Sequence, residues 1–81
     1  MLSNEQIEVR LQAVDGVEYV QVTGDGYHYH LTIVSDVFLG QSKVFRQQWV
    51  YTQLKEEITS GQLHALSMKT WTKNEWETQH G

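Results

Sequence analysis

Residues 17–36, VEYVQVTGDGYHYHLTIVSD, decide the fold of this chain. They contain two runs rich in β-branched and aromatic residues, a composition typical of strands, on either side of Gly24-Asp25-Gly26. Glycine adopts the positive φ angles that a tight hairpin turn requires. The stretch therefore predicts two antiparallel strands joined by a turn at residues 24–26.

The second strand of this hairpin separates its side chains into two kinds. Apolar and polar residues alternate along it, and successive side chains of a strand point to opposite faces of the sheet. We expect the apolar set to face the helices and the polar set to face the other, accessible side. The two sets are Tyr29, Leu31 and Ile33, and His28, His30 and Thr32.

Helix signals lie before and after the hairpin. A Ser or Thr followed three residues later by Gln or Glu is a capping box, and this spacing begins at Ser3 and at Thr72. The first box predicts a helix over residues 4–14. The second predicts a short last helix through Trp76.

The segment between the hairpin and the last helix is expected to contain a long helix and a third strand. Residues 43–60 carry a stripe at helical intervals that ends at Gly61. Residues 62–71, QLHALSMKTW, have the composition of a strand. The predicted stripe consists of Val44, Gln47, Tyr51, Leu54 and Ile58.

The order helix, strand, strand, helix, strand, helix indicates an α/β (α+β) fold of type II KH-like architecture. A right-handed crossover makes the second and third strands parallel where they pair. We predict a three-stranded mixed sheet with helices on one face. KH domains clamp single strands with a Gly-x-x-Gly loop, whereas residues 39–43 here, LGQSK, hold one glycine.

Length and composition fit one domain over residues 1–81, near the small end of what folds without help. The chain has no cysteine, so a metal bound by this chain alone must use His, Asp or Glu. The polar N-terminus lacks the apolar core of a signal peptide, and no apolar run approaches the roughly 20 residues of a membrane span. We expect a cytoplasmic protein.

Common catalytic motifs are missing from the sequence. It has no thiol nucleophile, no Gly-x-Ser-x-Gly elbow, no Walker loop and no dinucleotide fingerprint. The pair Gly24-x-Gly26 lies in a turn between strands and not at the start of a helix. We therefore do not expect an enzyme.

The net charge of -4 and the pI near 5.4 have the wrong sign for a protein that binds phosphates by electrostatics alone. The charge is uneven, because residues 1–36 hold one Arg and six acids whereas residues 37–81 hold five Lys or Arg and four acids. Lys43, Arg46 and Lys69 are the candidate nucleic-acid contacts. An ordinary solvated surface explains the same three residues.

The histidines are the candidate metal ligands. His28-x-His30 has the spacing of ligands on one strand, but two imidazoles do not fill a tetrahedral site. His64 and His80 are the other imidazoles of the chain. Two unrelated surface histidines are the simpler interpretation of this spacing alone.

Several motifs together resemble the BolA family, and within it the acidic bacterial IbaG/YrbA-like branch. The resemblance covers about residues 5 to 77, with its parts in the right order and at the right spacing. In order, the motifs are Gly24-Asp25-Gly26 with His28, Val34-Ser35 with Phe38 and Gly40, Arg46-Gln47-Gln48 with Val50-Tyr51 and Leu54, Leu63-His64-Ala65-Leu66-Ser67, and Thr72 with Glu75-Trp76.

This resemblance implies a partnership with a monothiol glutaredoxin in handling [2Fe-2S] clusters. The proposed family ligands, a His or Cys after the first hairpin turn and a His at the start of the last strand, correspond to His28 and His64. His30 matches no family position and is a secondary candidate ligand. A partner cysteine and a glutathione thiolate would complete the four ligands of the cluster. The isolated chain is expected to hold no cluster.

Family proteins are also linked to transcriptional regulation. The alternative is therefore a nucleic-acid-binding regulator that uses the KH-like surface around Lys43, Arg46 and Lys69. Phosphate binding weakens steeply with added salt, whereas pairing through a cluster responds to iron, glutathione and chelators. A homodimer is a further expected assembly, and no membrane partner is expected.

Overall fold

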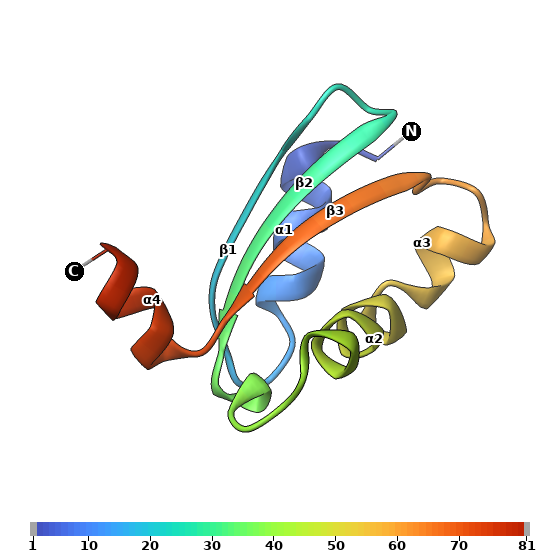
Figure 1. Ribbon diagram of the computed structural model, residues 1–81. Coiled ribbons are helices and arrows are strands. Elements are labelled where there is room, and N and C mark those ends of the chain that lie inside the picture. Colours follow the sequence, from blue (N-terminus) through green and yellow to red (C-terminus); the bar gives the residue numbers. More distant parts are fainter. Residues whose placement is uncertain (1, 81) are drawn as a thin grey trace.

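The computed structural model describes residues 2–80 and has the predicted order of elements (Figure 1). The predicted α+β class and the mixed three-stranded sheet are confirmed. No helix within residues 2–80 is long and apolar enough to cross a lipid bilayer. The elements are α1 (Asn4–Gln12), β1 (Val17–Gly24), β2 (His28–Ser35), the 3-10 turn η1 (Asp36–Phe38), α2 (Lys43–Gln53), α3 (Lys55–Thr59), β3 (Ala65–Trp71) and α4 (Lys73–His80).

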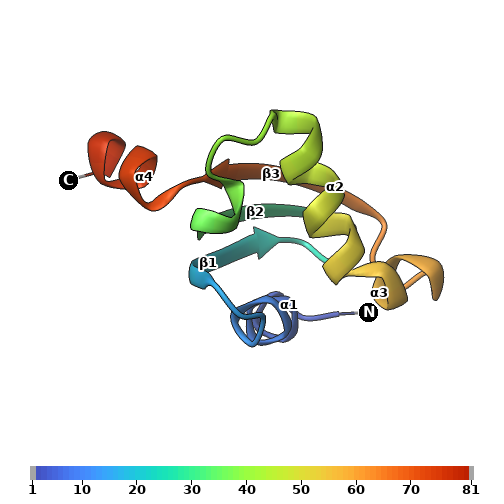
Figure 2. The same ribbon diagram turned by 90° about the horizontal axis from the view of Figure 1, so that it is seen from below.

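β2 is the central strand of the sheet, and Figure 2 shows the three strands side by side in the order β1-β2-β3. β2 pairs antiparallel with β1 and parallel with β3, as the crossover argument predicts. His28, at the start of β2, lies opposite Ala65, the first residue of β3. The parallel pairing thus brings the segment before β3 to the hairpin end of the sheet.

The main core lies on one face of the sheet. Tyr29, Leu31 and Ile33 of β2 are at most 2% exposed, which confirms the predicted alternation. They pack against buried side chains of α1, α2 and the loops, and removal of this apolar surface from water is the dominant stabilising term. The rest of the cluster consists of Ile7, Leu11, Val20, Val22, Phe38, Val50, Leu54 and Leu63.

The helix predicted over residues 43–60 is interrupted at Leu54. Its backbone angles, φ -105° and ψ 18°, leave the helical region, so the segment forms α2 and α3. The carbonyl oxygen of Glu57 then accepts a hydrogen bond from the N–H of Leu63 at 3.0 Å. This bond closes the turn that leads the chain from α3 toward β3.

The buried side of α2 differs from the predicted stripe. Val50 and Leu54 are fully buried, and Trp49 meets Phe38 edge-on with ring centroids 5.4 Å apart. The predicted stripe assumed one continuous helix, whereas this aromatic contact and the interruption at Leu54 set a different rotation of α2. Leu54 is the one buried member of the predicted stripe, and the exposed members are Val44, Gln47, Tyr51 and Ile58.

α4 is the exception to the prediction that the helices share one face. Its Trp76 stacks on Tyr19 of β1 with ring centroids 5.3 Å apart and meets Trp71 of β3 at 6.0 Å. Val34, the ladder partner of Tyr19, is 1% exposed although it lies outside the main core cluster. By strand alternation Val34 lies on the same face of β2 as His28 and His30, and its ladder partners Tyr19 and Trp71 share that face. α4 therefore covers one end of that face, because doing so brings these aromatic rings into contact and partly buries Trp71 and Trp76.

α1 runs along the outer edge of β1 and pairs with its backbone groups. An open edge strand is a template for pairing with another chain, and these contacts close the edge of β1. Polar side chains four positions apart make them: Asn4 Nδ2 donates to the Gly24 carbonyl at 3.3 Å, Glu8 Oε2 accepts from the Val22 N–H at 2.8 Å, and Gln12 Nε2 donates to the Val17 carbonyl at 3.3 Å.

Replacing Glu8 with Ala is expected to destabilise the fold by about 1–2 kcal/mol, because the partly buried Val22 N–H loses a charged acceptor. Urea unfolding measures the change, and hydrogen exchange at Val22 should accelerate. Glu8→Gln keeps an acceptor oxygen and is expected to lose less stability. Equal losses in the two variants would contradict the assigned role of this hydrogen bond.

Candidate functional site

The hairpin turn fixes the position of His28. Gly24 and Gly26 have φ angles of 148° and 95°, and a Cβ at position 24 would clash with the carbonyl oxygen of His28. One carboxylate oxygen of Asp25 accepts hydrogen bonds from the N–H groups of Tyr27 and His28, both at 2.9 Å. These bonds, led by the one from His28, lower the pKa of the Asp25 carboxyl. The turn is thus held by a carboxylate that stays charged.

Both hairpin histidines lie on the face opposite the main core, as predicted. His28 and His30 are exposed at the start of β2. His30 Nδ1 lies 2.7 Å from Ser67 Oγ on β3, so one of its ring nitrogens already has a protein partner. The structure gives His28 no such side-chain partner within residues 2–80, and its imidazole is the more available of the two.

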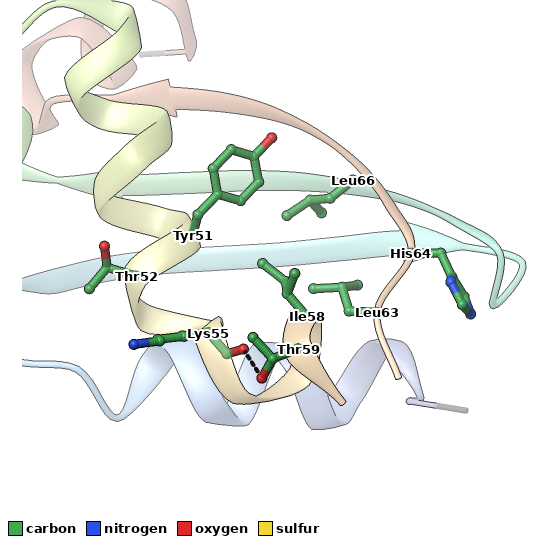
Figure 3. A pocket seen from close by; sticks show the side chains of 8 residues that line it. All are labelled: Tyr51, Thr52, Lys55, Ile58, Thr59, Leu63, His64 and Leu66. Carbon is green, nitrogen blue, oxygen red and sulfur yellow. Dashed lines mark hydrogen bonds between the residues drawn. The ribbon is translucent and has the colours of Figure 1, made fainter. Parts of the chain in front are cut away.

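His64 lies immediately before β3, between two hollows of the surface. One, of about 490 Å³, is lined by Tyr51, Ile58, Leu63 and Leu66 among others. Figure 3 shows these apolar side chains gathered together, while the exposed His64 ring points away from them. The other hollow, of about 210 Å³, is lined by His64 together with the hairpin turn, including Tyr27.

The sheet brings the backbones of His28 and His64 to the same end. Ala65 pairs with His28, and its N–H donates to the carbonyl of Tyr27 at 3.3 Å. The side chain of His28 leaves from the open face, whereas that of His64 borders the hollow on the α2 and α3 side. Residues 2–80 contain no group of three or more His, Cys, Asp or Glu that could hold a metal ion. His28 and His64 are thus accessible imidazoles, with no third metal-ligating side chain grouped with them in this part of the chain.

His80, the remaining histidine, lies at the end of α4, and its contacts are with Trp76 and Trp71 and not with the hairpin end of the sheet. Its ring stacks on Trp76 with centroids 3.7 Å apart, and Trp71 meets it edge-on at 5.7 Å. Its Nδ1 lies 3.1 Å from the Trp76 carbonyl oxygen. His80 thus belongs to the aromatic cluster that α4 forms with Trp71, and it does not contact the candidate metal ligands.

The three candidate nucleic-acid contacts lie in one place. Lys43, Arg46 and Lys69 all line a groove of about 600 Å³ between α2, β3 and α4. Within residues 2–80 neither lysine forms an ion pair. The sequence indicated these three residues, and the fold places them together. We name the groove that they line the basic groove.

The guanidinium of Arg46 is already bonded to other groups of the protein. Its guanidinium binds both carboxylate oxygens of Glu75 at 2.8 and 3.3 Å and donates to the carbonyls of Thr70 and Gln41 at 3.2 and 3.0 Å. The side chain of Arg46 is 12% exposed. The hydrogen bond from Arg46 and then that from the Thr72 N–H lower the pKa of Glu75 to about 2. Arg46 therefore links α2, β3 and α4, and two lysines remain as the available cations of the groove.

Sequence reasoning missed two carboxylates of these sites. Glu75 was expected as a capping residue, and it does accept from the Thr72 N–H at 2.8 Å, but its pairing with Arg46 spans 29 positions. Asp25 was assigned to the turn without a role for its side chain. The Gly-Asp-Gly sequence was a usable signal, because Asp side chains accept hydrogen bonds from backbone N–H groups two residues on. No local signal indicated the pairing of Glu75 with Arg46.

Comparison with known proteins agrees with the predicted family. The sequence model described as BolA-like protein matches residues 2–75, most of the chain. The chain belongs to the BolA-like protein family. The predicted resemblance is confirmed.

Relatives and solved structures extend this match. The BolA-like chain is 37% identical over 75 residues to the acid stress protein IbaG of Escherichia coli K12, covering 93% of this chain and 89% of that protein. It is 31% identical over 87 residues to the DNA-binding transcriptional regulator BolA of the same strain, covering 95% and 82%. The structure of a BolA protein homologue from Coxiella burnetii is similar with a TM-score of 0.83 and 29% identity, covering 95% of this chain and 99% of that one.

The pairing of Glu75 with Arg46 makes stability depend on acid pH. Because the pKa of Glu75 falls from 4.5 to about 2 on folding, the unfolded state binds more protons between these values. The stabilisation is complete above pH 4.5 and is lost as the pH falls toward 2. It amounts to ~1 kcal/mol, since the Glu75 side chain is 45% exposed and solvent screens the pair.

Glu75→Gln should therefore lose that amount at pH 7 and show a flatter stability profile between pH 4.5 and 2. Chemical unfolding at a series of pH values measures both effects. Glu77→Gln, an exposed carboxylate on the same helix, is the matched control and should keep the native profile. Identical profiles for all three proteins would refute the role of Glu75.

Proposed function

We propose that this BolA-like protein is an iron-sulfur accessory protein that pairs with a monothiol glutaredoxin and shares a [2Fe-2S] cluster with it. His64 supplies one imidazole ligand and His28 a second, with His30 as the secondary candidate. The observation that supports this most is the placement of exposed His28 and His64 at one end of two paired strands. The role is cluster assembly, delivery or sensing, and not catalysis.

The donor chemistry fits a shared cluster. A [2Fe-2S] cluster takes four ligands, and imidazoles replace two thiolates in Rieske-type sites. This chain has no thiolate and, within residues 2–80, no group of three metal-ligating side chains. A partner cysteine and a glutathione thiolate would supply the missing ligands. On this proposal the isolated chain holds no cluster, and the cluster itself joins the two proteins.

Accessibility also favours a shared site. His64 is exposed beside the apolar hollow of Tyr51 and Ile58, and His28 is exposed on the neighbouring strand. An iron ion bound by a partner could reach either imidazole without unfolding the hairpin. The glycine turn and the Asp25 carboxylate hold His28 in register with the segment before β3. This arrangement keeps the backbones of the two residues at one end of the sheet before the partner arrives.

The test is the visible absorption and circular dichroism spectrum of the chain mixed with a monothiol glutaredoxin, iron, sulfide and glutathione. His64→Ala is expected to abolish the spectrum of the mixed complex or alter it strongly, and His28→Ala to shift it. His30→Ala, on the same face of β2, and His80→Ala, in the aromatic cluster, are matched imidazole controls and should leave it nearly unchanged.

An unaltered spectrum for His64→Ala would refute the ligand assignment. A change in His30→Ala that exceeds the change in His28→Ala would transfer the second ligand to His30. Thermal unfolding of each variant, recorded without iron, shows whether a lost spectrum reflects a lost ligand or a lost fold.

The second candidate function is nucleic-acid binding, which the convergence of Lys43, Arg46 and Lys69 in one groove favours. One relative of the chain is named a DNA-binding transcriptional regulator. Against this function stand the net charge of -4 and the engagement of Arg46 by Glu75. We expect binding to duplex DNA to be nonspecific, with a Kd of roughly micromolar or weaker at physiological salt. A sequence-selective nanomolar complex would reverse this ranking.

A further inference from the structure

The two edge strands of the sheet differ in whether their outward backbone groups have partners. α1 closes the edge of β1 through the side chains of Asn4, Glu8 and Gln12. β3 forms the other edge, because β2 is its one neighbour in the sheet. An unpaired edge presents a row of N–H and C=O groups that can bind another extended chain.

The hydrogen-bonding pattern identifies which groups of β3 point outward. The Ala65 N–H donates toward β2, and alternate residues of a strand direct their backbone groups to opposite sides. Leu66, Met68 and Thr70 therefore direct theirs away from the sheet. The Thr70 carbonyl accepts from Arg46 at 3.2 Å, which agrees with this assignment. No other hydrogen bond within residues 2–80 reaches the outward groups of these three residues.

Two grooves are lined by successive outward residues of this edge. Leu66 lines the apolar hollow of about 490 Å³ formed with Tyr51 and Ile58 (Figure 3). Met68 and Thr70 line the basic groove of about 600 Å³. An extended segment that paired with β3 would thus pass an apolar hollow and then a cationic one. Since residues in a strand advance ~3.3 Å each, the two hollows match side chains a few residues apart.

The charge of the basic groove selects an acidic occupant. Arg46 and Glu75 neutralise each other, while Lys43 and Lys69 have no ion-pair partner within residues 2–80. The chain as a whole is acidic, so this groove is a local cationic exception. Carboxylates of a bound segment would find two unpaired ammonium groups there.

A second copy of the chain fits this edge less well. Pairing of β3 with β3 would bring the Lys69 and Lys43 groups of both copies together, and like charges across neighbouring strands are destabilising. The phosphates of a nucleic acid would accept from the two available cations and from the outward N–H groups, but they would leave the outward C=O groups of Leu66 and Met68 without a donor. A peptide backbone uses both features.

We propose that the open edge of β3 binds an extended acidic peptide segment of a partner protein as a fourth strand of the sheet. Backbone hydrogen bonds form at Leu66, Met68 and the N–H of Thr70. An apolar side chain of the segment enters the hollow beside Tyr51, and its carboxylates pair with Lys43 and Lys69. This surface goes beyond the cluster function proposed above and needs neither iron nor His64.

The probe is a capped ten-residue peptide of alternating Glu and Val, added without iron at low salt and followed by two-dimensional ¹⁵N–¹H NMR. The amides of Leu66, Met68 and Thr70 should shift saturably, and their hydrogen exchange should slow. A peptide with Lys in place of Glu should not bind. A peptide of the Glu sequence N-methylated at alternate residues, which removes backbone donors, should bind at least tenfold more weakly.

Lys43→Glu and Lys69→Glu should each weaken binding about threefold or more. Lys73→Glu makes the same change of charge outside both grooves and should leave the affinity unchanged. Equal binding of the N-methylated peptide, or no shift at β3 at millimolar peptide, would overturn the proposal. Stronger binding of an eight-nucleotide oligothymidylate at the same amides would also overturn it and would assign the edge to nucleic acid. Concentration-dependent shifts of these amides without peptide would overturn it as well and would assign the edge to a second copy of the chain.

Discussion

The hydrogen bonds that hold β2 between an antiparallel and a parallel neighbour determine where every other feature of the molecule lies. The antiparallel pairing with β1 follows from a turn of two glycines and one aspartate. The parallel pairing with β3 requires a crossover, and α2 and α3 provide it on the core face. A shift of β2 by one residue in its register would move Tyr29, Leu31 and Ile33 from the core to solvent. The same register brings His64 beside the hairpin.

The Arg46 guanidinium has a comparable role at the other end of the sheet. It joins three elements by bonding Glu75 of α4, the Thr70 carbonyl of β3 and the Gln41 carbonyl before α2. α4 itself contributes no residue to the main core and is held by this pairing and by the stack of Trp76 on Tyr19. One arginine therefore both positions the last helix and removes a cation from the groove. For this reason, the presence of Arg46 in the basic groove is weak evidence for phosphate binding.

Local patterns predicted the fold well, and features that depend on distant contacts were predicted poorly. Capping boxes, the glycine turn and strand alternation act within a few residues, so α1, the hairpin and the start of α4 were correctly expected. The rotation of α2 depends on Trp49 meeting Phe38, and the face chosen by α4 depends on Tyr19, 57 positions before Trp76. Neither contact leaves a periodic signal. The convergence of Lys43 and Lys69 likewise arises from the crossover and not from their spacing.

The open edge of β3 raises a question of selectivity, because an exposed edge strand also invites aggregation. Lys69 lies on this strand and Lys43 lies at the start of α2 beside the same groove. A basic strand would therefore be repelled there, and a neutral strand would gain backbone hydrogen bonds alone. An acidic strand gains the same backbone hydrogen bonds and two ion pairs in addition. Charge thus separates intended from unintended partners at one edge, as repulsive elements do in specific interfaces. The edge of β1 has no such lysines in its contacts and is instead closed by α1, so each edge is protected by a different means.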